Sequence, residues 1–443
     1  MLEDIAIKIS VKIKESPIKS SRASVEGFFR QARKRSREAC PRPEGGGEAD
    51  GGVKVIAKWF SIRQEARRRH DTKRMRFKKI LAFLFAAIIG FSYIAGLSVS
   101  EAREKAAAGD TASLRRKASH RGKTPLRGAA LRPGDCIGVL APGFYDDKDD
   151  YAEATAILEA QGYRLKFAPS CTAREGYFAG PDSLRASDIN RMFLDDEVKA
   201  IICLRGGYGA ARLLDKLDYQ AIADHPKALI GFSDATALHA ALWEKCRLAT
   251  IHGPVLCSLR KRNAYALQQF LAGISSAAPL GELKLPPGEK MRTVVAGEAE
   301  GVIIGGNLTV VASLAGTPYE LKGDGALLLL EEDGEDSYRI DRMLNQLWQN
   351  GLLQRVNGIL LGDFFDTDDD LAPGDYTTEE VLTYYANLCG KPVIKGVPSG
   401  HGSDNAFLPL GVHVVMRARP DGTASLVFDE AALTDSMKNR RKE

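Results

Sequence analysis

The sequence lacks the cysteine patterns that build zinc sites or disulfide frameworks. Its seven cysteines are scattered over 443 residues, and no two of them form a C-x-x-C pair. Disulfide scaffolds are typical of short secreted chains with closely spaced cysteines, so this chain is expected to rely on a hydrophobic core. Its 44% hydrophobic residues and its length allow two or three domains.

Complete phosphate-binding and calcium-binding motifs are also missing. The stretch Arg205-Gly206-Gly207-Tyr208-Gly209 follows an apolar run but has neither the full G-x-G-x-x-G spacing nor a Walker lysine. The acidic runs at 331–333 and 366–370 lack the spacing of a calcium loop. We therefore expect no metal and no other cofactor. Glycines also let backbone N–H groups approach a substrate oxyanion closely, and this use fits the 205–209 loop better.

Excess positive charge is confined to the N-terminal segment. The formal net charge is +5, but residues 1–79 hold 22 Lys and Arg against 10 Asp and Glu, which leaves −7 on the rest. A nucleic-acid interface would rest on this segment alone, and it has no interleaved aromatic side chains for base stacking. We expect no nucleic-acid partner.

An apolar run near the N-terminus suggests export. Residues 1–74 show little periodicity and are predicted to lie outside any packed domain. Met75-Arg76-Phe77-Lys78-Lys79, the uncharged run at 80–97 and a small-residue exit have the layout of a signal peptide that starts at Met75. A membrane anchor is the alternative, since the run is just long enough to span a bilayer. We expect a periplasmic or other extracytoplasmic protein, with a cytoplasmic location as the alternative, and a linker at 101–130.

From residue 131 onward, apolar β-like runs alternate with helical patterns. Strands are expected at 136–142, 163–168, 200–204, 228–232 and 248–254, with helices at 150–161, 183–194, 210–217 and after residue 233. This alternation predicts an α/β, Rossmann-like domain with a parallel sheet at 131–275. A linker at 276–296 is expected to lead to a second, mixed and more β-rich domain of the swivelling type at 297–435, with helices at 338–349 and 378–388.

The stretch Gly231-Phe232-Ser233-Asp234-Ala235 has the layout of a nucleophile elbow. It joins an apolar run to a helix, so the sharp turn would push the Ser233 hydroxyl off the sheet and turn the Asp234 N–H toward an oxyanion. The alternative is that Ser233 only N-caps the helix. Its place at the carboxyl end of a parallel strand, where open α/β sheets bind ligands, favours the nucleophile.

A serine nucleophile needs a base and an acceptor that orients the base. Among the seven histidines, His401 lies in a glycine- and proline-rich loop of the kind that carries functional side chains, although a surface turn would look the same. A four-leucine run ends in Glu331-Glu332-Asp333 and would present carboxylates at the end of a strand. A solvated acidic turn and a metal site are the alternatives to an acceptor.

Taken in order, these motifs resemble the LD-carboxypeptidases, serine peptidases of family S66 that include microcin C immunity peptidases. The resemblance covers roughly residues 131–430. It rests on motifs at 205–209, 231–236, 252–254, 305–308, 330–331 with 338–344, and 400–402 with 408–411.

The resemblance implies a role for each candidate residue. Ser233 would be the nucleophile, His401 the general base and Glu331 the acid that orients it. The Asp234 N–H and a glycine of the Gly206-Gly207 pair would form the oxyanion hole.

It also implies a cleft between two domains, no metal, and commonly a homodimer. The substrate would be a muropeptide, from which the family removes the terminal D-alanine by cutting an L,D amide bond. Arg205 is our own candidate for holding a substrate carboxylate, with a structural salt bridge as the alternative.

The sequence departs from the family pattern in two places. Glu332-Asp333 and Asp336-Ser337 stand where less acidic residues and proline are usual, and the first 125 residues have no counterpart in the cytoplasmic recycling enzymes. A microcin-C-type immunity peptidase is therefore kept as an alternative function. A catalytically silent protein that binds cell-wall peptides is the alternative from outside the enzymes.

Overall fold

The computed structural model describes residues 124–146, 151–368 and 371–435. The basic segment, the predicted signal or anchor run at 80–97 and most of the 101–130 linker lie outside these residues. Among the helices that are described, none combines the length and the apolar character needed to cross a bilayer.

The first sheet has six strands in the order β12-β5-β4-β3-β1-β2. Its elements are β1 (Cys136–Leu140), β2 (Arg164–Phe167), β3 (Val198–Cys203), β4 (Ala228–Gly231), β5 (Thr250–His252) and β12 (Leu408–Leu410). Strands β1 to β5 are mutually parallel, as predicted. The short β12 comes from the far end of the chain and pairs antiparallel with β5. Because it contains Pro409, which has no N–H to donate, β12 fits only at the edge of a sheet.

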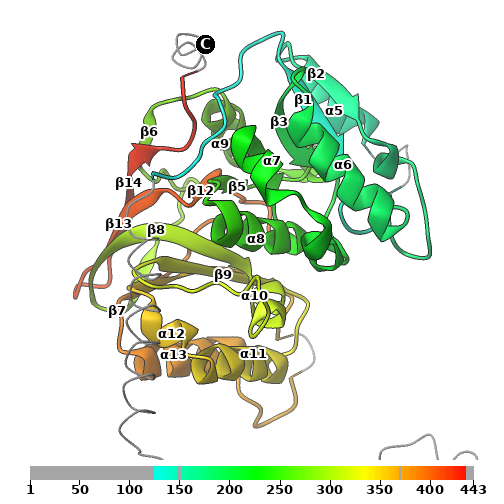
Figure 1. Ribbon diagram of the computed structural model, residues 1–443. Coiled ribbons are helices and arrows are strands. Elements are labelled where there is room, and N and C mark those ends of the chain that lie inside the picture. The colour runs from blue at the N-terminus through cyan, green and yellow to red at the C-terminus, as the bar shows by residue number, and fades with distance from the viewer. Residues whose placement is uncertain (1–123, 147–150, 369–370, 436–443) are drawn as a thin grey trace, which may run out of the picture. The chain divides into compact units, whose positions relative to one another are not determined.

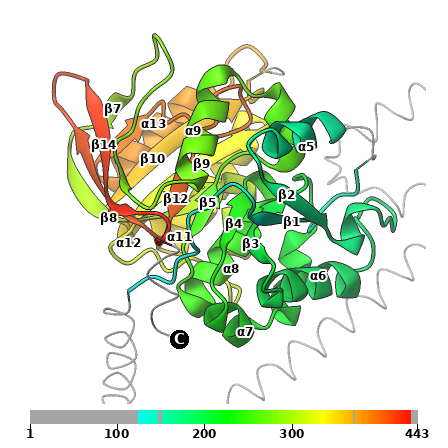
Figure 2. The same cartoon turned by 90° about the horizontal axis from the view of Figure 1, so that it is seen from above.

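Helices cover both faces of the first sheet (Figure 2). One layer holds α6 (Asp182–Leu194), α7 (Tyr219–Asp224) and α8 (Thr236–Cys246), and the other holds α5 (Ala152–Glu159) and α9 (Ala264–Ile274). Side chains alternate along a strand, so Ile201 packs with the α6–α8 layer and Ile202 with the α5–α9 layer. Since both faces are buried in the middle of the sheet, β1, β3 and β4 read as largely apolar runs, whereas the edge strand β2 is mostly exposed.

Short 3-10 helices connect several of these elements. They are η2 (Pro169–Cys171), η3 (Ala210–Lys216), η4 (Ser233–Ala235) and η5 (Leu256–Lys261). The segment expected as a helix at 210–217 is η3, so the helical character was predicted but not its tighter winding.

The second sheet has eight strands in the order β6-β14-β13-β8-β9-β10-β11-β7. Its elements are β6 (Pro279–Glu282), β7 (Arg292–Val295), β8 (Gly297–Asn307), β9 (Leu327–Asp333), β10 (Gly358–Phe365), β11 (Val393–Lys395), β13 (His413–Ala418) and β14 (Ala424–Ala431). The strands from β8 to β11 are parallel, and the others pair antiparallel. The two sheets with their helices confirm the predicted mixed α/β fold.

The stretch expected as a linker at 276–296 contains β6 and β7, which form the two edges of the second sheet. Neither strand is buried along its length, and β6 includes Pro279 and Gly281. These edge strands therefore lack the apolar alternation by which strands are recognised in a sequence.

One buried core reaches from the first sheet to the second. Figure 1 shows α8 between the two sheets and α11 (Ser337–Gln349), α12 (Leu352–Arg355) and α13 (Thr378–Cys389) on the far side of the second. Leu238 of α8 and Leu308 of α10 (Leu308–Leu314) belong to the same cluster of buried side chains. The two sheets are therefore packed as one body.

The four leucines of β9 alternate between two cores. Leu328 and Leu330 pack with the helices of the second sheet, whereas Leu327 and Leu329 face a separate core that includes side chains of β13 and β14. The alternation continues past Leu330. The Glu331 side chain therefore lies on the same face of the sheet as Leu329, and the Glu332 side chain lies on the opposite face. The direction of the two acids is thus set by the register of an apolar strand.

We predict that Leu329→Ala lowers the free energy of unfolding by about 2–5 kcal/mol, because it leaves a cavity at a fully buried position. Leu388→Ala is the matched control, since Leu388 is 40% exposed and its loss should change stability by no more than about 0.5 kcal/mol. Urea unfolding of both variants measures the difference. Equal effects of the two substitutions would show that β9 is not at the centre of the core.

Candidate active site

Ser233 sits at a strained turn where β4 ends and η4 begins. Its φ is +61°, a left-handed value that is uncommon for a residue with a side chain. The N-cap positions of η4 and α8 are Phe232 and Ala235, and neither side chain makes a capping hydrogen bond. Ser233 is therefore not the helix cap that the sequence allowed as an alternative. Backbone strain held by the surrounding structure is a recurrent feature of active sites.

The glycine loop after β3 lies directly against Ser233. A Cβ atom on Gly206 would stand 3.0 Å from both Cβ and Oγ of Ser233 and 3.9 Å from the backbone nitrogen of Asp234. Gly207 has a φ of +113°, and a Cβ there would meet the Phe144 ring at 2.5 Å. The missing side chains therefore leave space around the Ser233 hydroxyl and bring two backbone segments together there.

The Asp234 side chain ties the glycine loop to the elbow. Its buried carboxylate accepts hydrogen bonds from the backbone N–H of Ala210 at 2.9 Å and of Gly209 at 3.3 Å. Burial raises the pKa of Asp234 to about 6 in spite of these donors. The side chain of Asp234 thus has a structural role, and its backbone N–H is the group predicted for the oxyanion hole.

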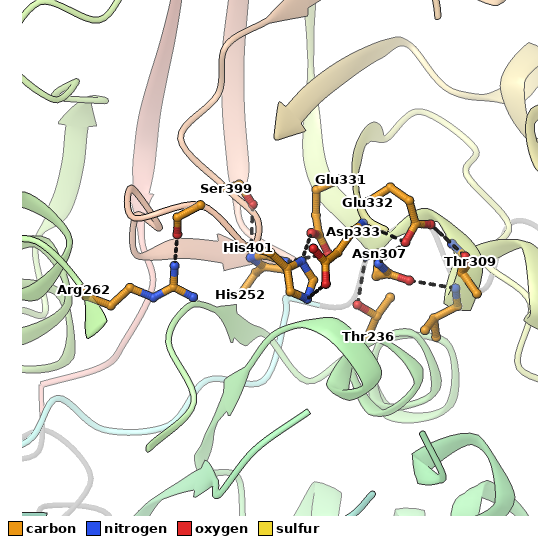
Figure 3. Close-up of polar contacts among 12 residues, drawn as sticks. Thr236, His252, Arg262, Asn307, Thr309, Glu331, Glu332, Asp333, Ser399 and His401 are labelled. Carbon is orange, nitrogen blue, oxygen red and sulfur yellow. Dashed lines mark hydrogen bonds and ion pairs between the residues drawn. The ribbon is translucent and has the colours of Figure 1, made fainter. Parts of the chain in front are cut away.

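Glu331 and His401 form the closest acid–imidazole pair of the site (Figure 3). Glu331 Oε2 lies 2.9 Å from His401 Nδ1, and the Glu331 side chain is fully buried. Burial raises the pKa of Glu331, but two facing histidines outweigh it and hold the pKa at about 2. Burial lowers the pKa of His401, but the hydrogen bond and the charge of Glu331 leave it above its ordinary value. Glu331 is therefore ionised and stabilises an imidazolium.

Glu332 points the other way and holds the start of α10. Its carboxylate accepts hydrogen bonds from Asn307 Nδ2 at 2.9 Å and from the N–H and Oγ1 of Thr309 at 2.8 Å (Figure 3). The sequence motif singled out Glu331 by its spacing alone. Strand alternation supplies the physical reason, since only Glu331 lies on the side of the His401 loop.

A cavity of about 720 Å³ brings the two sheets' candidates together. The sequence-predicted residues on its wall are Arg205, Gly206, Gly207, Ser233, Asp234 and His401, and Asp333 lies there too. Among the described residues no hydrogen bond links the Ser233 hydroxyl to His401. The outer nitrogen of His401, Nε2, has the Asp333 carboxylate 3.9 Å away.

Arg205 makes the salt bridge that was one of the two alternatives considered for it. Its Nη1 lies 3.3 Å from Asp146 Oδ1 and 3.3 Å from the Tyr145 carbonyl oxygen. Arg205 therefore makes a salt bridge with Asp146 and a hydrogen bond to the backbone beside it. The side chain is also 39% exposed and lines the cavity, and its contact with a substrate carboxylate stays a prediction.

The acidic loop at 366–370 has a structural contact in its described part. Asp368 Oδ1 accepts hydrogen bonds from the N–H and Oγ1 of Thr378, at the start of α13. Within the described ranges, no group of three or more His, Cys, Asp or Glu side chains is arranged to hold a metal ion.

Sequence reasoning missed Arg262 and left His252 without a role. Arg262 Nη1 donates to the carbonyl of Gly402, and its guanidinium lies 5.0 Å from the Phe232 ring centroid. The Phe232 ring is in turn 4.8 Å from the His401 ring. Arg262 follows Arg260 and Lys261, so in the sequence it looks like part of a solvated basic run.

Comparison with known proteins identifies the family. Residues 137–253 match the LD-carboxypeptidase N-terminal domain of family S66, and residues 300–416 match the LD-carboxypeptidase C-terminal domain. The chain belongs to the LD-carboxypeptidase family. The two matched regions contain Ser233 and Glu331 with His401, respectively.

Curated relatives and a solved structure support this assignment. The chain is 36% identical to a probable murein peptide carboxypeptidase of Bacillus subtilis (strain 168), over 65% of this chain and 90% of that protein. It is 35% identical to the murein tetrapeptide carboxypeptidase of Pseudomonas aeruginosa, over 63% of this chain and 92% of that protein. The structure of the self-immunity protein MccF with glutamyl sulfamoyl guanosine has a TM-score of 0.64 at 24% identity, covering 70% of this chain and all of MccF, and shows the fold alone.

We predict that Glu331→Gln lowers the pKa of His401, because a neutral amide no longer stabilises the imidazolium. Glu332→Gln is the matched control, since the neighbouring carboxylate points to α10 and should leave this pKa within about 0.3 units. NMR titration of histidine-labelled protein, with His401→Ala to assign the resonance, measures both. An unchanged His401 pKa in Glu331→Gln would contradict the pairing.

Proposed function

We propose that this protein is a serine LD-carboxypeptidase, which hydrolyses the L,D amide bond to the terminal D-alanine of murein tetrapeptides. The observation that carries the proposal is the shared cavity, because it joins Ser233 on its strained elbow to the His401–Glu331 pair. The names of the two curated relatives support the same substrate class.

The chemistry follows the usual course of acyl transfer. His401 Nε2 takes the proton of Ser233 Oγ while the oxygen attacks the scissile carbonyl. The tetrahedral oxyanion is stabilised by the Asp234 N–H and an N–H of the Gly206-Gly207 pair. D-Alanine leaves with the proton from His401, and water then hydrolyses the acyl-enzyme with His401 again acting as base.

Glu331 has the role of orienting and charge-stabilising partner. Its pKa of about 2 keeps it ionised throughout the cycle, so it holds the proton on His401 Nδ1 and stabilises the imidazolium. The resulting rise in the pKa of His401 favours proton uptake from Ser233.

Recognition of a free C-terminal carboxylate requires a cation near the nucleophile. Arg205 and Lys261 both line the cavity. We assign the D-alanine carboxylate to Arg205, whose planar guanidinium can bind a carboxylate through two hydrogen bonds.

We predict that Ser233→Ala lowers D-alanine release from a murein tetrapeptide by at least about 10⁴-fold while the protein stays folded. Ser275→Ala is the control, since this exposed hydroxyl bonds only to the end of its own helix. Mass spectrometry of the products and circular dichroism are the measurements. Undiminished release by Ser233→Ala would refute the nucleophile.

The same assay separates the alternative functions. An acyl-sulfamoyl adenosine offered beside the tetrapeptide tests a microcin-C-type peptidase, and we expect the tetrapeptide to be the better substrate. Binding of the tetrapeptide without turnover by the wild-type protein would instead identify a catalytically silent wall-peptide-binding protein.

We predict that Gly206→Ala lowers kcat by about 10²-fold, because the methyl group crowds Ser233 Oγ at 3.0 Å. Stability should change little, since Gly206 is not among the described glycines with a left-handed backbone. Gly253→Ala is the matched control, because its nearest contact is an ordinary 3.6 Å. Kinetics and thermal melting of both variants provide the test, and equal kcat values would contradict the close approach.

A further inference from the structure

His252 is a buried histidine beside the catalytic acid but outside the cavity wall. It ends β5 and has a fully buried side chain. Its Nδ1 lies 3.2 Å from Ser399 Oγ, and its Nε2 lies 3.9 Å from Glu331 Oε1 (Figure 3). Glu331 therefore lies between two imidazoles, with His401 on one oxygen and His252 on the other.

The two facing atoms have no other partner. His252 Nε2 and Glu331 Oε1 are both buried, and neither makes a hydrogen bond within the described residues. Buried polar atoms without a partner are costly, so almost all of them are paired in native proteins. A separation of 3.9 Å is too long for a hydrogen bond, but a shift of about 1 Å would close it. Catalytic hydrogen bonds are often long without substrate and tighten when it binds.

The contact between Ser399 and His252 is consistent with a proton on His252 Nε2, the nitrogen that faces Glu331. When the Ser399 hydroxyl donates to Nδ1, the neutral imidazole carries its proton on Nε2. Ser399 lies two residues before His401, so His252 contacts both the acid and the loop of the base.

The backbone of His252 is fixed to the wall that carries the nucleophile. In the parallel pairing of β4 and β5, His252 stands opposite Gly231, two residues before Ser233. On its other side it pairs with Leu408 of β12. A single residue thus connects the strand before the serine to the carboxylate on the second sheet.

We propose that His252 is a positioning residue, whose Nε2–H holds Glu331 Oε1 so that Oε2 stays on His401 Nδ1. The kinetic part of this inference rests on the proposed carboxypeptidase function. The structural part, which concerns the orientation of Glu331, does not.

Other charged groups near the pair are unchanged by substitutions at His252. Asp333 of β9 and Arg262, which directly follows η5, act on His401, and Asp363 of β10 interacts with Glu331. Within the described residues, His239 of α8 also interacts electrostatically with His252. A change in the titration of His401 on substitution of His252 therefore reports the loss of its hold on Glu331.

Two conservative variants separate positioning from a merely structural role. In His252→Gln the side-chain amide reaches the place of Nε2 and can still donate to Glu331, whereas in His252→Asn it reaches only the place of Nδ1. We expect the pKa of His401, measured by NMR titration of the full chain, to fall in His252→Asn and to stay near the wild-type value in His252→Gln. Ser399→Ala, which keeps the imidazole, should shift it in the same direction as His252→Asn.

The kinetic readout should follow the same order. We expect kcat for D-alanine release to fall about tenfold in His252→Asn, a loss like that caused by removing a residue that orients a metal ligand. KM should be unchanged, because His252 does not line the cavity. His252→Gln should restore most of kcat.

The control is His239→Gln, which alters a buried histidine of α8 that bonds to the Gly231 carbonyl and has no hydrogen bond or ion pair with Glu331 among the described residues. It should leave the pKa of His401 unchanged. An equal His401 pKa in the wild type, His252→Asn and Ser399→Ala would overturn the proposal, and so would a His252→Gln variant that behaves like His252→Asn. If the wild-type protein releases no D-alanine, the proposed function fails, and the titration still decides the role of His252.

Discussion

The buried carboxylate of Glu331 is the constraint on which the arrangement of the site depends. A charge removed from water is tolerated only when partners surround it, and here the partners come from two distant segments. His401 lies on the loop after β11, and His252 ends β5 of the other sheet. Bringing two histidines to one carboxylate therefore requires that β9, the His401 loop and β5 come together. The antiparallel pairing of β12 with β5 serves the same end, because β12 directly follows that loop.

Ser233, the proposed nucleophile, is held by a separate set of interactions on the opposite wall. The positive φ of Ser233 aims its hydroxyl, and the Asp234 carboxylate anchors the glycine loop against it. Each wall is thus ordered by its own contacts, and the proposed reaction needs only that the two walls face each other across the cavity. Arg262, which directly follows η5, strengthens that relation, since it donates a hydrogen bond to the carbonyl of Gly402, next to His401.

Local patterns predicted the parts of the fold that depend on local chemistry. Largely apolar runs identified β1, β3 and β4 because both faces of the sheet are buried there, and the elbow pattern at residues 231–235 singled out Ser233. The edge strands β6, β7 and β12 were missed because pairing at an edge leaves little apolar signal. The contacts of His252 and Arg262 could not be predicted either, since they join residues far apart in sequence. Glu331 was chosen over Glu332 by motif spacing, and strand alternation explains that choice.

The most direct test of the account is a double-mutant cycle on D-alanine release with Ser233→Ala, His401→Ala and both together. Residues that act as one catalytic unit show strongly non-additive losses. If Ser233 and His401 act as one unit, the double variant is no slower than the slower single variant, within about twofold. Losses that multiply would show that the two residues act independently and would contradict their joint role.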